Sequence, residues 1–504
     1  MDYSTLQNGS DIRGVALAGI PGEDVTLTED AVRHIARGFF RWLSDRRAPG
    51  AALRLAVGRD SRLSGETIAG WLASELAAAG AAVTDMGLCT TPAMFMTTVT
   101  PGFLFDGAVM ITASHLPWNR NGLKFFTASG GAESADIKRI LALGTEPLGE
   151  RPGGSVERGA FLDVYAAQLR DKIVSAAGRE APLAGYRIVV DAGNGAGGFF
   201  AEKVLAPLGA DVSGSLYLEP DGRFPNHVPN PELPEAMESI RAAVLASHAD
   251  LGVIFDTDVD RAGAVLADGG ELNRNRLIAL MSAIVLREHP GTAVVTDSIT
   301  STGLAAFIAR RGGVHRRFKR GYRNVINEAL RLNAEGQDCQ LAMETSGHGA
   351  MKENWFLDDG AYLITKMLIE LACGRRLETL LEGLPEPAES REFRMRVTAP
   401  DFRSAGETVL AALDRYAAAR PGWAIEPENY EGVRVSLDAK HGDGWFLLRL
   451  SLHDPILPLN IESDRAGGVR AIARELAPFL AGCEGIDAAP LLEYAVDGSA
   501  GKDR

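Results

Sequence analysis

A strand–loop–helix pattern that recurs three times along the chain constrains the fold more than any other feature. In each copy an apolar run ends in a loop of Asp and small residues, and a helix-like stretch and another apolar segment follow. The three runs with their loops are Leu53–Gly65, Tyr186–Gly198 and Thr292–Gly303. Continuous apolar strands that alternate with helices are typical of βαβ units, whose parallel sheets have helices on both faces. The pattern therefore predicts an α/β fold with ligand sites in loops at the carboxyl ends of its strands.

The spacing of these copies and the length of the chain predict several domains. A chain of 504 residues is too long for one hydrophobic core, and a repeat of about 100 residues indicates similar whole domains rather than a solenoid. The C-terminal part differs, because two strand-like segments, EGVRVSLD and GWFLLRLSL, flank the turn AKHGDG there. We expect a smaller α+β domain in this part. The expected boundaries give four domains: 1–155, 156–270, 271–387 and 388–504.

Composition and charge exclude several classes of partner. The net charge is −14 and the chain has no run of Lys and Arg of the kind that tracks a phosphate backbone, which argues against nucleic acid as the main partner. No apolar run approaches the roughly 20 residues that span a bilayer, and the polar N-terminus lacks the apolar core of a signal peptide. The four cysteines are far apart, as expected in a reducing compartment. These features predict a cytoplasmic protein without a membrane partner, and they leave open whether it is a monomer or a dimer.

The segment LGVIFDTDVDRAG carries the sharpest chemical signal. An apolar run delivers Asp256, Asp258 and Asp260 at alternate positions. Carboxylates this close together repel one another, and a hard divalent cation such as Mg²⁺ removes the conflict. An EF-hand is excluded because Arg261 and Ala267 stand where that loop needs Gly and Glu. An acidic surface turn, or a haloacid-dehalogenase-type phosphatase with Asp256 as nucleophile, remains an alternative.

A second signal lies in VMITASHLPWNRNGLKFF, where an apolar run ends at Thr112. Ser114 and His115 follow in a loop of small residues, and Lys124 comes shortly after. A serine hydroxyl is a weak nucleophile unless a neighbouring base or cation assists it. The Ser–His pair alone is therefore a weak signal, because such a pair more often stands in an ordinary loop than in a site.

These segments together resemble one enzyme family. TASHLPWNRNGLKFF resembles the phosphoserine loop of the α-D-phosphohexomutases, and DTDVDR resembles their metal-binding loop. METSGHGA resembles their sugar-binding segment, and NGSDIRG resembles their opening segment. The matching segments occur in the family's order over essentially the whole chain, which makes a chance resemblance improbable.

The resemblance implies three similar mixed α/β-sheet domains and a smaller C-terminal α+β domain around a central cleft. The four domains would hold, in order, the phosphoserine, the metal, the sugar and a phosphate group. The implied catalytic residues are Ser114, His115, Lys124, Arg13 and Arg261. The implied ligands of Mg²⁺ are Ser114, Asp256, Asp258 and Asp260. The implied substrate-binding residues are Glu344, Ser346, His348, Arg449, Ser451 and His453.

The implied activity is the interconversion of hexose 1-phosphate and hexose 6-phosphate, with glucose or mannose as the sugar. Phospho-Ser114 would donate its phosphoryl group, and a hexose 1,6-bisphosphate would serve as intermediate and activator. The chain departs from the family at the phosphate loop, where RLSLHDP replaces RPSGTEP, and at KRGYRNV, which matches neither the Gly-His nor the Gly-Asp-Arg pattern of the family. A phosphoglucosamine mutase, a Mg²⁺-dependent sugar phosphatase and a sugar-phosphate sensor without turnover therefore remain alternatives.

Overall fold

The computed structural model describes residues 2–48, 51–149, 152–451 and 454–496. The chain divides into two compact units. The first unit comprises Met1–His289 and Leu332–Glu382, and the second comprises Pro290–Arg331 and Gly383–Arg504.

The first part of unit 1 is built around an eight-stranded mixed sheet. Its strands are β1 (Gln7–Asn8), β2 (Asp11–Val15), β3 (Arg54–Arg59), β4 (Ala82–Leu88), β5 (Gly107–Ile111), β6 (Arg120–Thr127), β7 (Gly130–Gly131) and β8 (Ser155–Arg158). They lie in the order β1-β2-β6-β5-β3-β4-β8, and β7 pairs with β6. The central strands β3, β4 and β5 are parallel, whereas β6 runs antiparallel to β5. The expected parallel core is therefore present, with antiparallel strands added on the side of β6.

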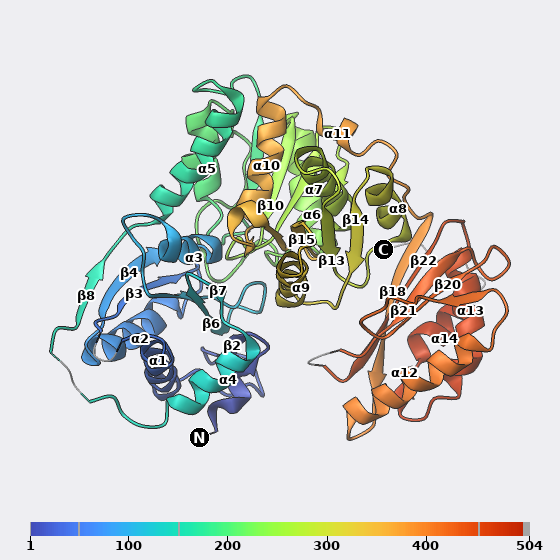
Figure 1. The fold of residues 1–504 in the computed structure, drawn as a ribbon, viewed down its shortest axis with the longest axis horizontal. Coiled ribbons are helices and arrows are strands. Elements are labelled where there is room, and N and C mark those ends of the chain that lie inside the picture. The colour runs from blue at the N-terminus through green and yellow to red at the C-terminus, as the bar shows by residue number, and fades with distance from the viewer. Residues whose placement is uncertain (1, 49–50, 150–151, 452–453, 497–504) are drawn as a thin grey trace. The chain divides into compact units, whose positions relative to one another are not determined.

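Helices cover this sheet and close its core. They are η1 (Tyr3–Leu6), α1 (Glu29–Ser44), α2 (Gly65–Ala78), α3 (Thr91–Val99) and α4 (Ser134–Leu143). Helices α1, α2 and α4 lie side by side, as Figure 1 shows. Thr28 caps α1 by accepting a hydrogen bond from the backbone N–H of Ala31, and the apolar face of α1 packs in the core with Phe39 fully buried. The five residues of β5 are all buried, which explains the unbroken apolar run in the sequence.

The second sheet of unit 1 has the order β12-β11-β10-β9. Its elements are α5 (Leu162–Ala177), β9 (Ile188–Asp191), η2 (Phe200–Leu205), η3 (Ala206–Leu208), α6 (Pro234–Ser247), β10 (Leu251–Phe255), β11 (Ala262–Leu266), β12 (Glu271–Leu272) and α7 (Arg274–Glu288). Strands β9 and β10 are parallel, and β11 returns antiparallel beside β10. One expectation was wrong. The apolar segment that follows the second helix-like stretch forms only isolated bridges, Arg187 with Asp211 and Asp191 with Leu216, because several turn-forming residues interrupt it.

The rest of unit 1 is a short antiparallel ribbon with its helices. The elements are β15 (Cys339–Met343), β16 (Gly349–Met351), η4 (Lys352–Asn354), β17 (Leu357–Asp358), α10 (Gly360–Ala372) and α11 (Leu377–Leu380). The N-cap of α10 is Asp359, which accepts hydrogen bonds from the Tyr362 N–H, the Tyr165 hydroxyl and the Asn354 amide. This buried carboxyl group anchors the start of α10 against α5 and η4.

Unit 2 contains a parallel strand pair and a six-stranded sheet. Its elements are β13 (Ala293–Thr296), α8 (Thr302–Arg310), β14 (Val314–Arg317), α9 (Tyr322–Ala334), β18 (Glu389–Val397), α12 (Phe402–Ala418), β19 (Trp423–Ile425), β20 (Val433–Leu437), β21 (Gly444–Leu448), β22 (Ile456–Ser463), α13 (Gly468–Ala481), β23 (Ile486–Asp487) and α14 (Ala489–Val496). The C-terminal end of α9 belongs to unit 1. Strands β13 and β14 are parallel, and the sheet of order β19-β20-β21-β22-β18-β23 contains only antiparallel pairs.

These sheets confirm the expected fold class. The three copies of the strand–loop–helix pattern lie in three different sheets, and the two strand-like segments near the C-terminus are the antiparallel neighbours β20 and β21. The division into four domains at 155, 270 and 387 remains a prediction. Among the described residues, no helix combines the length and the apolar character that crossing a membrane requires.

Candidate active site

The loop that follows β5 presents Ser114 in an uncommon backbone conformation. Ser114 has a φ of +49° and only 1% of its surface is exposed. Its backbone N–H donates to the Thr112 hydroxyl at 2.9 Å. Strand β6 then returns so close to β2 that a Cβ atom on Gly122 would lie 2.2 Å from the carbonyl oxygen of Ile12. Glycine at this position therefore lets β6 pass close to β2, and β6 carries Lys124 to a position opposite Met110 of β5.

The three aspartates lie in the turn between β10 and β11. Asp256, Asp258 and Asp260 are buried, and each offers a carboxylate oxygen within 4.8 Å of the other two. Val259 has a φ of +66°, so the turn holds a left-handed residue between two of the carboxylates. One oxygen of Asp258 and one of Asp260, Oδ1 in both, are buried without a hydrogen-bond partner among the described residues. The expected acidic cluster is therefore formed, with unsatisfied oxygens in it.

The electrostatics of this cluster favour a cation. Burial and the charges of Asp260 and Asp258 raise the pKa of Asp256 well above its usual range. Burial also disfavours the charged form of Asp260, but Lys124, His348 and Arg261 together more than offset this and lower its pKa well below the usual range. Buried carboxylate oxygens without partners are the ligands that hard divalent ions take. The residues present therefore fit a metal ion.

Ser114 and Lys124 reach this cluster from the other sheet of unit 1. The Ser114 hydroxyl donates to Asp256 Oδ2 at 2.8 Å. The Lys124 ammonium group donates to Asp260 Oδ2 and lies 3.4 Å from Asp258 Oδ2. Two segments that the sequence analysis singled out separately are thus brought into one site.

Arg261 links the serine to two histidines. Its Nη2 atom lies 3.4 Å from the Ser114 hydroxyl and 3.0 Å from His115 Nδ1, and its Nε donates to His348 Nε2 at 3.2 Å. Burial and the charges of Arg261 and Arg13 lower the pKa of His115 to about 2. Burial and Arg261 also lower the pKa of His348. Both imidazoles are therefore neutral near pH 7.

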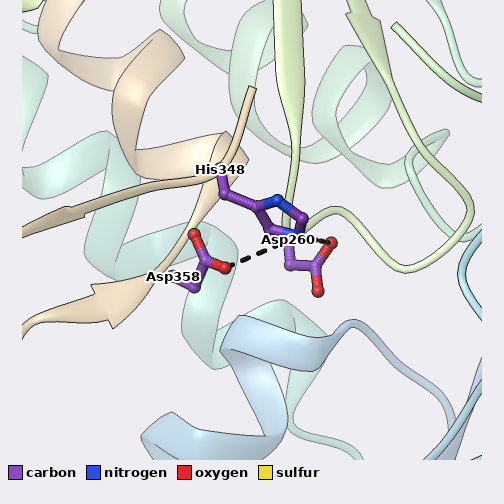
Figure 2. A group of neighbouring side chains, drawn as sticks. All are labelled: Asp260, His348 and Asp358. Atoms are coloured by element: carbon purple, nitrogen blue, oxygen red, sulfur yellow. Dashed lines mark ion pairs between the residues drawn. The ribbon is translucent and has the colours of Figure 1, made fainter. Parts of the chain in front are cut away.

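The sugar-binding segment predicted from the sequence lies against the same cluster. His348 Nδ1 lies 2.8 Å from the Ser346 hydroxyl and 3.7 Å from Glu344 Oε2. Figure 2 shows the ring of His348 between the carboxylates of Asp260 and Asp358. Its Nε2 atom lies 3.5 Å from Asp260 Oδ1 and 3.6 Å from Asp358 Oδ2. His348 thus connects the aspartate cluster with Asp358 of β17.

Arg13 joins the site from β2. It lies opposite Gly122 in the register of β2 and β6, and its Nη2 atom contacts Asp11 at 2.8 Å. The effect of Arg13 on the pKa of His115 indicates that its positive charge acts on the serine loop. Unit 1 therefore contains eleven of the fourteen site residues that the sequence predicts, namely Arg13, Ser114, His115, Lys124, Asp256, Asp258, Asp260, Arg261, Glu344, Ser346 and His348.

The remaining predicted residues belong to unit 2. Arg449 has a side chain only 11% exposed, and its closest carboxylate oxygen, Glu431 Oε1, is 3.9 Å away. Arg449 Nε has no hydrogen-bond partner among the described residues. Ser451 accepts a hydrogen bond at its hydroxyl from the backbone N–H of Asp454. His453 lies outside the described residues.

Two residues of the site were missed by the sequence analysis. The Thr91 hydroxyl donates to Asp258 Oδ2 at 2.5 Å, and the Thr91 N–H donates to the Asp258 carbonyl at 2.9 Å. Asp358 is buried, neither of its carboxylate oxygens has a hydrogen-bond partner among the described residues, and burial and Asp260 raise its pKa well above the usual range. Thr91 begins α3 in an ordinary capping pattern, so its contact with the aspartate loop could not be predicted from the sequence.

Comparison with known proteins places this architecture among sugar-phosphate mutases. Residues 4–146, 163–269 and 273–388 match the models of alpha/beta/alpha domains I, II and III of phosphoglucomutase/phosphomannomutase. A phosphoglucomutase of Neisseria gonorrhoeae is 32% identical over 460 residues, which cover 90% of this chain and 93% of the relative. A phosphomannomutase/phosphoglucomutase of Pseudomonas aeruginosa is 33% identical over 463 residues, which cover 90% of this chain and 91% of the relative.

A solved structure extends the likeness to the whole fold. The crystal structure of a phosphoglucomutase/phosphomannomutase family protein from Burkholderia thailandensis matches with a TM-score of 0.79 and 28% identity. The match covers 97% of this chain and 100% of the Burkholderia thailandensis chain. The family models match more than half of the residues, and both relatives exceed 30% identity over most of their length. The chain therefore belongs to the α-D-phosphohexomutase family.

Proposed function

We propose that the protein is a magnesium-dependent phosphohexomutase that interconverts hexose 1-phosphate and hexose 6-phosphate through phospho-Ser114. The observation that carries this proposal is the 2.8 Å contact between the Ser114 hydroxyl and Asp256, a member of the buried aspartate cluster. Phosphoryl transfer needs a donor or acceptor atom next to concentrated positive charge. Ser114 supplies the atom, and a cation held by the aspartate cluster, together with Lys124 and Arg261, would supply the positive charge.

The aspartate cluster is the proposed Mg²⁺ site. Asp256, Asp258 and Asp260 would hold the ion together with the oxygen on Ser114. When bound, Mg²⁺ supplies positive charge that offsets the negative charge of the transferring phosphoryl group. The orphaned Oδ1 atoms of Asp258 and Asp260 support this assignment, because a buried carboxylate oxygen without a partner is costly.

Two cations of the chain add to this charge. Lys124 contacts the carboxylates of Asp258 and Asp260, so it would place positive charge next to the transferring group. Arg261 Nη2, 3.4 Å from the Ser114 hydroxyl, is positioned to bind phosphoryl oxygens attached there. Arg13 adds a third positive charge to the serine loop.

The two histidines would contribute differently. A group with a pKa of about 2 is a poor proton acceptor near neutral pH, so His115 would orient the serine and Arg261 by hydrogen bonds. The neutral His348 is the better acceptor for a hydroxyl proton. With Glu344 and Ser346 beside it, His348 would bind the hydroxyl groups of the sugar.

The reaction we propose has two phosphoryl transfers. Phospho-Ser114 donates its phosphoryl group to the free hydroxyl of the hexose monophosphate, which gives the 1,6-bisphosphate. The bisphosphate turns around, and its other phosphoryl group returns to Ser114. During each transfer the non-reacting phosphate needs a separate site, which we assign to Arg449, Ser451 and His453. The largely buried Arg449 guanidinium group, whose Nε has no hydrogen-bond partner among the described residues, supports an anion there.

The sugar and the domain roles are inferred from family membership. The printed names of the relatives are phosphoglucomutase and phosphomannomutase, and we therefore propose glucose and mannose phosphates as substrates. We also propose that residues 1–155 carry the phosphoserine, 156–270 the metal, 271–387 the sugar-binding segment and 388–504 the phosphate loop. The hexose 1,6-bisphosphate would restore the phosphoserine when the intermediate escapes.

The test is an assay of the purified protein with glucose 1-phosphate, Mg²⁺ and a trace of glucose 1,6-bisphosphate. Appearance of glucose 6-phosphate supports the mutase. Release of inorganic phosphate in proportion to consumed substrate would instead indicate a phosphatase, and binding without isomerisation would indicate a sensor. The Ser114→Ala variant is the matched control, because it removes only the proposed phosphoryl carrier.

A further inference from the structure

Arg62, which follows β3 in the segment GRDSRLSG, is buried beneath the serine loop. Only 3% of its surface is exposed. Its two terminal nitrogens donate four hydrogen bonds, and all four acceptors are main-chain carbonyl oxygens of the segment 114–120. These carbonyls belong to Ser114 (2.5 Å), Leu116 (2.6 Å), Pro117 (2.8 Å) and Arg120 (2.9 Å). One guanidinium group therefore holds the backbone of most of the loop that carries Ser114.

These bonds determine how the peptide groups of the loop are oriented. The described chain has no cis peptide bond, and in a trans peptide the C=O and the following N–H point in opposite directions. Because the Ser114 carbonyl points at Arg62, the N–H of His115 points away from Arg62. This N–H has no hydrogen-bond partner among the described residues. It is therefore available to an acceptor on the side of the loop opposite Arg62.

The same bonds explain why the unusual backbone of Ser114 persists. A non-glycine residue at a φ of +49° is uncommon and strained. Such a conformation is kept only where the surroundings fix it. Here the Thr112 hydroxyl holds the N–H of Ser114, and Arg62 holds its carbonyl oxygen. The backbone of the residue is fixed on both sides.

The arrangement has an electrostatic consequence for phosphoryl transfer. Carbonyl oxygens are the negative ends of peptide dipoles and would repel a phosphoryl group. Arg62 draws four of them to its own side, so that a backbone N–H can face the anion instead. Arg62 itself is not in contact with the Ser114 hydroxyl, which lies with Asp256, His115 and Arg261. Its effect is therefore exerted through the loop.

We propose that Arg62 is a positioning residue that holds the loop 114–120 in its transfer-competent conformation and turns the His115 N–H towards the phosphoryl oxygens on Ser114. This inference rests on the proposed function, because it concerns the same serine. It adds a residue and a backbone donor that the phosphoserine assignment alone does not require.

The Arg62→Lys variant tests the arrangement of the hydrogen bonds separately from the positive charge. Lysine keeps the positive charge but has three N–H donors on a single nitrogen. It therefore cannot donate to four carbonyls that are arranged around a planar guanidinium group. The matched control is Arg41→Lys. Arg41 also donates to two main-chain carbonyls, those of Leu143 and Pro147, but none of its partners belongs to the site. Both variants lose hydrogen bonds to a loop, and only the first loses them beneath Ser114.

The experiment measures kcat, KM, Mg²⁺ affinity and the folded fraction for the full-length wild type and both variants. We expect Arg62→Lys to lower kcat by about 100-fold per folded molecule, since a displacement of about 1 Å has that effect, while KM and Mg²⁺ affinity stay near those of the wild type. Arg41→Lys should keep the wild-type kcat. An Arg62→Lys variant that is folded and turns over like the wild type would overturn the inference. A loss of activity that is fully explained by the unfolded fraction of the variant would also overturn the inference.

A second measurement does not depend on whether the variant folds. Residue-resolved amide hydrogen exchange compares wild-type protein with and without the phosphoryl group on Ser114. We expect the His115 amide to exchange more slowly in the phosphorylated form, and unchanged exchange would contradict the inference. Failure of the proposed function is recognised separately, because wild-type protein would then show no isomerisation and no phosphoserine.

Discussion

The hydroxyl group of Ser114 donates a 2.8 Å hydrogen bond to the carboxylate of Asp256, which lies 142 residues further along the chain. The two residues come from different sheets of unit 1, at the ends of β5 and β10. The contact brings a serine, an acidic cluster and the cations Lys124 and Arg261 into one site.

Thr91 should control the affinity of the metal site. Its hydroxyl holds Oδ2 of Asp258, which leaves Oδ1 available as a ligand. We expect Thr91→Val to weaken Mg²⁺ or Mn²⁺ binding by about 10–100-fold, the usual effect of losing a hydrogen-bond partner of a metal ligand. Calorimetric titration checks this. Thr91→Ser keeps the hydroxyl and should bind the metal like the wild type, whereas equal affinities for all three proteins would contradict the assigned role.

Lys124 should contribute positive charge that speeds phosphoryl transfer. Lys124→Met keeps the length of the side chain but removes the ammonium group that contacts Asp258 and Asp260. We expect kcat to fall by about 100-fold or more, because charge next to the transferring group acts in a water-poor site. Steady-state kinetics measure the effect, and Lys138→Met, which changes an exposed lysine of α4, is the control. A Lys124→Met enzyme with wild-type kcat would show that its charge is not used.

Arg449 should bind the phosphate that does not react. Because this phosphate is present in both orientations of the substrate, Arg449→Ala should raise KM for the 1-phosphate and for the 6-phosphate alike. A rise of about 10–100-fold corresponds to the loss of charge-assisted hydrogen bonds. The control is Arg394→Ala, whose side chain is 72% exposed in the same unit. An unchanged KM for both substrates would remove Arg449 from the phosphate site.

His227 should make stability depend on pH. Burial disfavours its charged form, but the hydrogen bond and charge of Asp191 more than offset this and raise its pKa above the usual value of 6.5. A raised folded-state pKa contributes stability that is fully present below about pH 6.5 and is lost as the pH rises through the higher folded-state pKa.

Urea unfolding at a series of pH values measures this contribution. His227→Gln retains a donor for Asp191 but cannot ionise, so the difference in unfolding free energy between wild type and variant should shrink as the pH rises above 6.5. The exposed His289→Gln serves as the control for the loss of a histidine. A difference that stays constant across the range would contradict the assignment.

Much of the fold and the site could be predicted because the signals are local in sequence. The alternation of Asp256, Asp258 and Asp260 after an apolar strand indicated a cation site, and the structure buries all three around unsatisfied oxygens. The apolar runs indicated strands with loops at their ends, and β5 and β10 end at the serine and the aspartates.

The rest could not be predicted because it depends on packing between distant segments. Thr91 and Asp358 stand in unremarkable local patterns, and only tertiary structure brings the first to Asp258 and the second to His348. The role of Arg62 could not be predicted for another reason. Its four hydrogen-bond acceptors are main-chain carbonyls, which every residue has, so no residue type in the sequence indicates them. The strand expected after the second helix-like stretch failed because turn residues interrupt its pairing.

The most direct test of the central claim is a pulse–chase experiment on Ser114. The wild-type protein is first incubated with a hexose bisphosphate that is radiolabelled in its phosphate groups. The labelled residue is then mapped by peptide mass as a gain of about 80 Da. Finally, unlabelled hexose monophosphate is added. We predict that the label lies on Ser114 and moves into the sugar during the chase. Label on another residue, or isomerisation by protein that never carries a label, would contradict the account.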